Sequence, residues 1–152
     1  MSNKILILGS TGFIGKNMTE FFLKNKNNKI FATYNKRKPF KDKRIKWIKC
    51  DLRKNNLDKL FLGIDIIIQA AATTSGAKII KKKPYLHVTD NAIMNSRILR
   101  SLLNSSVKHF IFFSCTVMYQ SSKKALSEND FSESDSIYKN YFGVGWTKVY
   151  IE

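Results

Sequence analysis

The sequence predicts an α/β fold in which a doubly wound parallel sheet of about five strands, in the order 3-2-1-4-5, is covered by helices. Three observations support it: a glycine-rich turn after a short apolar run, alternating strand-like and helix-like segments, and an apolar run at 65–72 without alternation. A strand of the last kind is buried on both faces, as in parallel sheets. Right-handed crossovers then place a ligand at the carboxyl edge of the sheet, beside strands one and four.

The first fifteen residues combine a strand, a tight turn and the start of a helix. The apolar run at 4–8 leads into G-S-T-G-F-I-G, with glycines at 9, 12 and 15, and apolar residues then recur at helical spacing. Glycine suits a backbone with positive φ, a close approach of a phosphate, or contact between helix and strand. Free N–H groups and the positive end of the helix dipole meet there, so the segment predicts an anion-binding turn.

The remaining elements follow from apolar periodicity and turn residues. The chain of 152 residues fits one domain, 1–152, and contains no internal repeat. We expect helices over about 13–25, 57–61, 92–105 and 141–152, strands over 4–8, 30–34, 45–52, 65–72 and 109–114, and loops over 35–39, from Ser75 to Pro84, and over 120–136.

The composition is strongly basic. There are 27 Lys and Arg against 11 Asp and Glu, a net charge of +16, which on its face suggests a polyanion partner. The lysines are spread over several loops and helix faces, so we interpret most of them as solvated surface. Two less favoured alternatives are that the lysines bind a polyanion partner, or that they steer phosphates toward a nucleotide site. We therefore expect no nucleic-acid partner.

Cysteine usage and hydropathy indicate a cytoplasmic protein. Cys50 and Cys115 are far apart and form no C-x-x-C pair, so we expect two reduced thiols and no metal site. No stretch approaches the ~18 apolar residues of a membrane-spanning helix. The apolar run at 5–8 is also too short for a signal peptide. We expect no membrane partner.

By the fifth predicted strand, the motifs resemble one family over nearly the whole chain. They are GSTGFIG at 9–15, Asp51-Leu52, Asp65 followed by IIIQAAA, AAATTSG at 70–76, Asn91, and SCTVMY at 114–119. The chain resembles the N-terminal half of an extended short-chain dehydrogenase/reductase of the NAD-dependent epimerase/dehydratase family, and within it the GDP-L-fucose synthase-type epimerase-reductases. The resemblance implies a Rossmann-type fold, an NAD(P) cofactor, a nucleotide-sugar substrate and a homodimer.

The resemblance also implies cofactor-binding residues. The glycine turn would cradle the pyrophosphate, the end of the third strand would line the adenine pocket, and the end of the fourth would pass beneath the ribose and nicotinamide. These residues are, in turn, Gly9, Thr11, Gly12, Phe13, Ile14 and Gly15; Asp51 and Leu52; and Ala70, Ala71 and Ala72.

The choice of cofactor follows from charge at the end of the second strand. An acidic residue there would bind both ribose hydroxyls and repel a 2′-phosphate. This chain has Asn35 instead, followed by Lys36, Arg37 and Lys38. Because the arginine fork suits a phosphate, we expect NADP(H) in preference to NAD. The alternative is another solvated basic loop.

The resemblance further implies a substrate-orienting hydroxyl. Family members have a Ser or Thr four residues before the tyrosine that matches Tyr119. In this chain that position is Cys115, with Ser114 and Thr116 on either side. Cys115 and Thr116 are therefore the candidates for this role.

A Tyr-x-x-x-Lys pair on the following helix is the second catalytic feature of the family. The tyrosine is the general acid/base, and the lysine holds the ribose and lowers the tyrosine pKa. Lys148 matches the lysine, but Val144 stands at the tyrosine position. Tyr141, one turn upstream, could point to a similar place. A conventional triad, a triad displaced to Tyr141, and loss or change of the chemistry all stay open.

The length is a further departure. The chain ends within a predicted helix, where family members continue into a C-terminal substrate domain, so we expect a truncated or fragmentary chain. The leading hypothesis is the cofactor-binding half of an NAD(P)-dependent sugar-nucleotide epimerase, dehydratase or reductase. The second is a non-catalytic or truncated dinucleotide-binding module, and the third is a basic polyanion-binding protein.

Overall fold

The computed structural model describes residues 2–74, 76–134 and 137–152, which form two compact units. Unit 1 comprises residues up to 72 together with 96–113, and unit 2 comprises 73–95 and 114–152. Ser75, in the motif at 70–76, and positions 135–136, in the expected loop at 120–136, lie outside the described residues.

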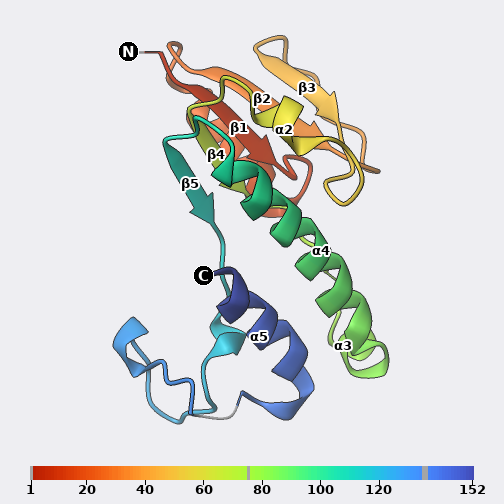
Figure 1. The fold of residues 1–152 in the computed structure, drawn as a ribbon, viewed down its shortest axis with the longest axis vertical. Helices are drawn as coiled ribbons and strands as arrows, with labels where there is room; N and C mark the ends of the chain where they lie inside the picture. The colour runs from red at the N-terminus through yellow and green to blue at the C-terminus, as the bar shows by residue number, and fades with distance from the viewer. Residues whose placement is uncertain (1, 75, 135–136) are drawn as a thin grey trace. The chain divides into compact units, whose positions relative to one another are not determined.

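Unit 1 is built on a five-stranded parallel sheet (Figure 1). Its order, β3-β2-β1-β4-β5, confirms the prediction. In the central strand, Ile5 pairs with Ile30 of one neighbour and Ile66 of the other. The strands are β1 (Lys4–Leu8), β2 (Lys29–Tyr34), β3 (Ile45–Lys49), β4 (Ile66–Gln69) and β5 (His109–Phe112).

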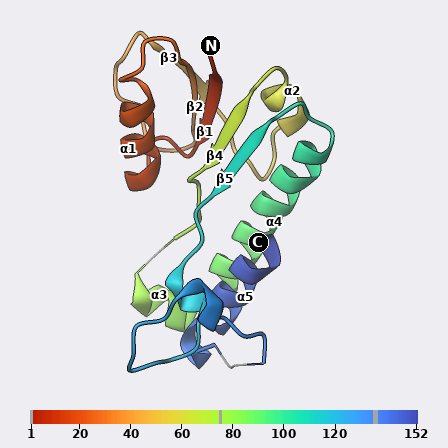
Figure 2. The same ribbon diagram turned by 90° about the vertical axis from the view of Figure 1, so that its left-hand side faces the viewer.

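Helices cover both faces of this sheet. Figure 2 shows α1 (Phe13–Phe22) on one face, and α2 (Leu57–Phe61) with the C-terminal part of α4 (Pro84–Leu103) on the other. Because both faces are covered, β1 is fully buried at Leu6, Ile7 and Leu8. On one side, Ile5, Ile7, Leu23, Ile30, Ala32, Ile45 and Ile68 form a single apolar core.

Unit 2 combines short helices with an extended connection. Besides the N-terminal part of α4, it contains α3 (Ala77–Lys82), three 3-10 turns, η1 (Thr116–Met118), η2 (Glu128–Asp130) and η3 (Lys139–Tyr141), and α5 (Phe142–Ile151). An isolated antiparallel bridge joins Gln120 to Ile137. Met118, Ile137 and Ile151 are buried.

Some predicted boundaries were wrong. The expected loop from Ser75 to Pro84 contains α3, and α4 begins at Pro84 rather than near residue 92. Proline is tolerated in the first turn of a helix, where its missing N–H would have no partner, and lysine is a good helix former. The α1 helix ends at Phe22 rather than near 25.

The structure leaves both cysteines as free thiols, Cys50 buried and Cys115 half-buried. Within the described ranges, no helix is long and apolar enough to cross a membrane. No group of three His, Cys, Asp or Glu side chains is placed to hold a metal ion among the described residues.

Candidate functional site

The glycine turn of unit 1 connects β1 to α1 in a conformation that requires glycine at two positions. Gly9 has φ +78°, and a Cβ there would lie 2.6 Å from the Cα of Ala71. A Cβ on Gly15 would lie 2.3 Å from the carbonyl oxygen of Gly9. Real Cβ atoms do not approach backbone this closely, so both positions exclude every larger residue.

The turn is held by hydrogen bonds to strand β2. The N–H of Gly9 donates to Thr33 Oγ1, and the N–H of Ser10 donates to the Thr33 carbonyl, both at 3.0 Å. Gly12 N–H donates to the Gly9 carbonyl at 3.0 Å and closes the turn. Thr33 is buried, and sequence reasoning missed it because threonine is an ordinary strand residue.

The start of α1 leaves amide donors available. Among the described residues, none accepts a hydrogen bond from the N–H of Thr11, Phe13 or Ile14. The first turn contains no acidic side chain that would compete for them. A cradle of free N–H groups at a helix N-terminus, with no room for a Cβ at Gly9 or Gly15, fits a pyrophosphate.

The end of β4 lies against this turn. Gln69, 2% exposed, accepts from the N–H of Ala71 and donates to its carbonyl, both at 3.1 Å. Strand β4 ends at Gln69, with one further backbone bond from the N–H of Ala70 to the Leu8 carbonyl, so the strand predicted over 65–72 was too long. Ala70 and Ala71 are half-buried and Ala72 is exposed. The pattern of small residues therefore lets backbone approach backbone beside Gly9.

The basic segment after β2 reaches the same turn. The Arg37 guanidinium donates from Nη1 to the carbonyl of Thr11 at 3.0 Å, while Asn35, Lys36 and Lys38 are exposed. The guanidinium is therefore next to the proposed phosphate cradle rather than in an independent loop.

At the end of β3, Asp51 is already paired. Both of its carboxylate oxygens accept from Arg53, at 3.0 Å from Nε and 3.0 Å from Nη2. These hydrogen bonds lower the pKa of the Asp51 carboxyl to about 2. Leu52 is buried, and its carbonyl accepts from Arg97 Nε at 3.3 Å. The predicted adenine-lining pair thus lies in a firmly held loop, although its carboxylate is occupied by a neighbour.

In unit 2, α5 packs closely on the η1 turn that follows Cys115. A Cβ on Gly145 would lie 2.9 Å from the carbonyl oxygen of Val117, so glycine permits this approach. The approach brings Lys148 into the electrostatic range of Cys115. Burial lowers the pKa of the half-buried Lys148, while Cys115 and Glu152 act in the opposite direction. Thr116, next in the chain, is exposed.

The position at which the resemblance predicts the acid/base tyrosine is occupied by Val144, and Tyr141 is the nearest alternative. Val144 lies within α5, one turn before Lys148. Its side chain has no ionisable group and therefore cannot exchange a proton. Tyr141 is the N-cap of that helix and the last residue of η3, so it does not project from the α-helix itself. Seven residues correspond to about 10 Å along a helix axis, roughly two turns, so Tyr141 and Lys148 do not lie on adjacent turns.

The chain matches one protein family over most of its length. The sequence model of the NAD dependent epimerase/dehydratase family matches residues 5–149. An uncharacterized UDP-glucose epimerase, YtcB, of Bacillus subtilis strain 168 is 26% identical over 139 residues, covering 83% of this chain and 44% of that protein.

Solved structures share the fold. The UDP-glucuronic acid 4-epimerase of Bacillus cereus, in complex with UDP-glucuronic acid and NAD, gives a TM-score of 0.79 at 24% identity, covering 96% of this chain and 49% of that one. A GDP-mannoheptose C4 reductase of Campylobacter jejuni, with NADP bound, gives 0.79 at 18% identity, covering 98% and 41%. This chain thus spans about half the length of the proteins it matches. It belongs to the NAD dependent epimerase/dehydratase family.

Proposed function

We propose that this chain is the cofactor-binding half of an NAD(P)-dependent sugar-nucleotide epimerase, dehydratase or reductase. The observation that supports it best is the glycine turn, in which several amides have no acceptor among the described residues and only glycine fits at positions 9 and 15. This turn stands at the carboxyl edge between β2 and β4, where ligands of doubly wound sheets bind.

The residues of unit 1 would hold the cofactor in three places. The amides of Thr11, Phe13 and Ile14 would donate to the pyrophosphate, with Gly9, Gly12 and Gly15 giving it room. Leu52 and Asp51 would line the adenine pocket, and Ala70 to Ala72 would border the ribose and nicotinamide. When bound, the nicotinamide supplies a reversible acceptor and donor of hydride.

We further propose that the cofactor is NADP(H), with NAD as the alternative. Arg37 is bonded to the carbonyl of Thr11 and so stands beside the turn, and Asn35 replaces an acidic residue that would repel a 2′-phosphate. Lys38 adds positive charge to the same segment. The relatives named above include one solved with NAD and one with NADP, so the family resemblance alone leaves this choice to the residues of the chain.

For the chemistry, we propose Lys148 as the residue that holds the ribose. Tyr141 is the candidate acid/base, displaced by one turn from the position of Val144. Cys115 and Thr116 are the candidates for orienting the substrate oxygen. The motifs taken together support a GDP-L-fucose synthase-like enzyme class, without identifying the sugar, and two of the relatives named above are a UDP-glucuronic acid 4-epimerase and a GDP-mannoheptose C4 reductase.

Val144 also supports a second candidate function, a dinucleotide-binding module without catalysis. A valine cannot transfer a proton, and the N-cap position of Tyr141 is about 10 Å along the helix from Lys148. Replacement of Val144 by tyrosine, in a chain joined to a complete C-terminal substrate domain, separates the two functions. A gain of hydride transfer supports the epimerase, dehydratase or reductase function, and no gain supports the non-catalytic module.

Thermal unfolding with NADPH, with NADH and without ligand tests the binding proposal. A ligand at one hundred times its dissociation constant stabilises by about 2.7 kcal/mol, which is a shift of roughly 2–8 °C for a domain of this size. We expect the larger shift with NADPH. A cooperative transition that responds to neither cofactor contradicts the proposal.

A further inference from the structure

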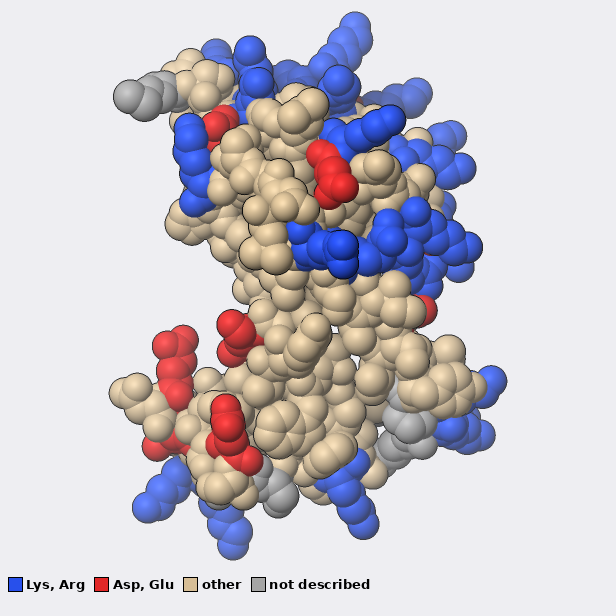
Figure 3. All heavy atoms as spheres, in the orientation of Figure 1, with Lys and Arg blue, Asp and Glu red and all other residues tan. Residues whose placement is uncertain are grey.

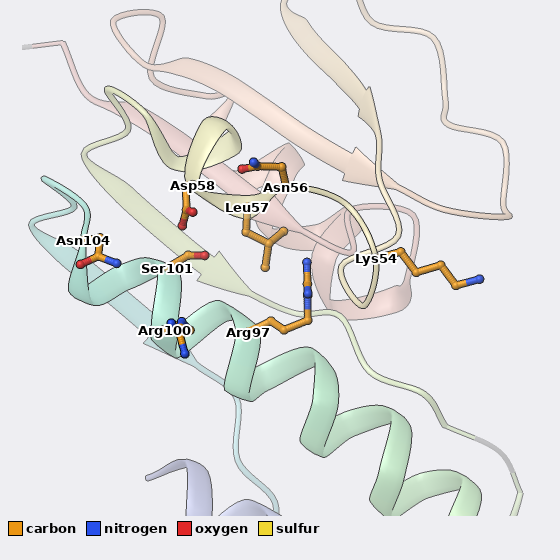
Figure 4. A pocket seen from close by; sticks show the side chains of 8 residues that line it. All are labelled: Lys54, Asn56, Leu57, Asp58, Arg97, Arg100, Ser101 and Asn104. Atoms are coloured by element: carbon orange, nitrogen blue, oxygen red, sulfur yellow. The ribbon is translucent and has the colours of Figure 1, made fainter.

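Unit 1 contains a polar pocket between α2 and the C-terminal part of α4. It has a volume of about 380 Å³, within the range of small-molecule sites. Figure 4 shows side chains from both helices and from the segment before α2 around it. Its lining residues are Lys54, Asn56, Leu57, Asp58, Arg97, Arg100, Ser101 and Asn104.

The charges in this pocket are unbalanced. The lining includes three cationic residues, Lys54, Arg97 and Arg100, and one carboxylate, Asp58. Figure 4 shows the Lys54 side chain extending away from the other labelled side chains. Among the described residues, neither Arg100 nor Asp58 forms an ion pair or a side-chain hydrogen bond. Arginine without a carboxylate partner is suited to phosphate, because its planar fork of donors matches the phosphate oxygens.

A serine hydroxyl also opens into this pocket. Ser101 is 8% exposed as a residue, and its Oγ makes no hydrogen bond to any residue that the structure describes. Because Ser101 lines the pocket, its hydroxyl is available to donate to a phosphate oxygen there.

We propose that this pocket binds a small phosphate monoester bearing hydroxyl groups, with the phosphate at Arg100, Arg97 and Ser101 and a ligand hydroxyl donating to Asp58. The arginines select the anion, and the carboxylate selects a hydroxylated ester over inorganic phosphate. Asn56 and Asn104 supply further polar groups on the wall. This site uses none of the residues of the glycine turn.

Occupancy of the pocket bears on the loop after β3. Arg97 donates from Nε to the Leu52 carbonyl at 3.3 Å and from Nη2 to the Asn55 carbonyl at 2.7 Å. Figure 4 shows this side chain reaching from α4 toward that loop. The same guanidinium therefore contacts both the ligand pocket and the loop that contains Asp51 and Leu52.

Titration with glucose 6-phosphate, inorganic phosphate and glucose at low ionic strength tests the proposal. Calorimetry or thermal unfolding of the whole chain provides the readout. We expect saturable binding of glucose 6-phosphate, weaker binding of phosphate, and no response to glucose. Arg100→Gln should raise the dissociation constant of glucose 6-phosphate about tenfold or more, since it removes a charge-assisted hydrogen bond.

Two further variants complete the experiment. Asp58→Asn should weaken glucose 6-phosphate while leaving inorganic phosphate unchanged. Lys59→Gln, which removes one exposed positive charge outside the pocket, should change neither constant more than about twofold. Equal effects of Arg100→Gln and Lys59→Gln, no saturable binding, or equal affinity for phosphate and its ester would each overturn the proposal.

Discussion

The two units differ in how their sequences meet the demands of the family. In unit 1, every glycine of the turn is present, and two of them occupy places that no side chain could share. In unit 2, Cys115 and Val144 stand where the resemblance predicts a hydroxyl and a tyrosine. The difference teaches that the predicted cofactor cradle depends on backbone geometry, which tolerates no substitution, whereas the catalytic groups depend on side chains that can change without loss of the fold.

The two units also differ in net charge. Unit 1 has 19 Lys and Arg against five Asp and Glu, a net charge of +14, whereas unit 2 has eight against six. On the face shown in Figure 3, blue side chains crowd over the part that holds the sheet. A positive field of this kind raises the association rate of phosphate-bearing ligands and weakens with salt.

The largest expected effect concerns unit 2. If Tyr141 is the displaced acid/base, Tyr141→Phe should lower kcat for a nucleotide-sugar substrate by about 10²–10⁴-fold. Tyr138→Phe is the matched control, because its ring lies 6.0 Å from that of Tyr141 and it also loses one hydroxyl. If kcat is the same in Tyr141→Phe, Tyr138→Phe and the unaltered chain, then Tyr141 is not the residue that transfers the proton.

The next effect concerns the turn in unit 1. Gly15→Ala forces a methyl group against the Gly9 carbonyl, so we expect a loss of about 1–3 kcal/mol in the free energy of unfolding. The stabilisation by NADPH should also disappear. Gly76→Ala serves as control, since a Cβ there meets nothing within 4 Å. Urea unfolding with and without NADPH measures both changes, and an unaltered NADPH response in Gly15→Ala would remove the turn from the binding site.

A smaller effect separates the two cofactors. Arg37→Gln should weaken NADPH about tenfold, or about 1.4 kcal/mol, and leave NADH almost unchanged. Lys36→Gln removes a neighbouring exposed charge and should affect NADPH less. Dissociation constants from the fluorescence of the reduced cofactors provide the comparison. Parallel losses for NADPH and NADH would mean that Arg37 contacts no 2′-phosphate.

The smallest effect is a dependence of stability on pH. Hydrogen bonds from Arg53 lower the pKa of Asp51 from 3.8 to about 2. A lowered carboxyl pKa contributes stability above the unfolded value, and this contribution is lost as the pH falls from about 4 to about 2. Arg53→Gln should cost less than about 1 kcal/mol at pH 7. The cost should vanish near pH 2, as measured by urea unfolding, whereas a constant difference would point to lost packing.

The sheet could be predicted from the sequence because its elements leave strong local marks. Continuous apolar runs in β1 and β4 reflect burial on both faces, and Gly9, Gly12 and Gly15 mark a turn where a phosphate can approach backbone. The strand order then follows from right-handed crossovers. These features depend on residue type and spacing within about ten positions of the chain.

What escaped prediction depends on contacts between distant or ambiguous residues. The start of α4 at Pro84 was missed because proline reads equally as a loop residue and as the first residue of a helix. The roles of Thr33 and Gln69 arise from hydrogen bonds that appear only once the strands are in register. Arg53 beside Asp51 is visible in the sequence, but its bidentate geometry is not.

The two outer strands of the sheet differ in how well they resist pairing with strands of other molecules. Exposed Lys46 and Lys49 on β3 oppose pairing of that edge with another molecule. On β5, which pairs with β4 in the described sheet, His109 is followed by half-buried Phe110, Ile111 and Phe112, with no charged side chain. An aromatic edge of this kind recruits further strands, so concentrated preparations should aggregate from β5.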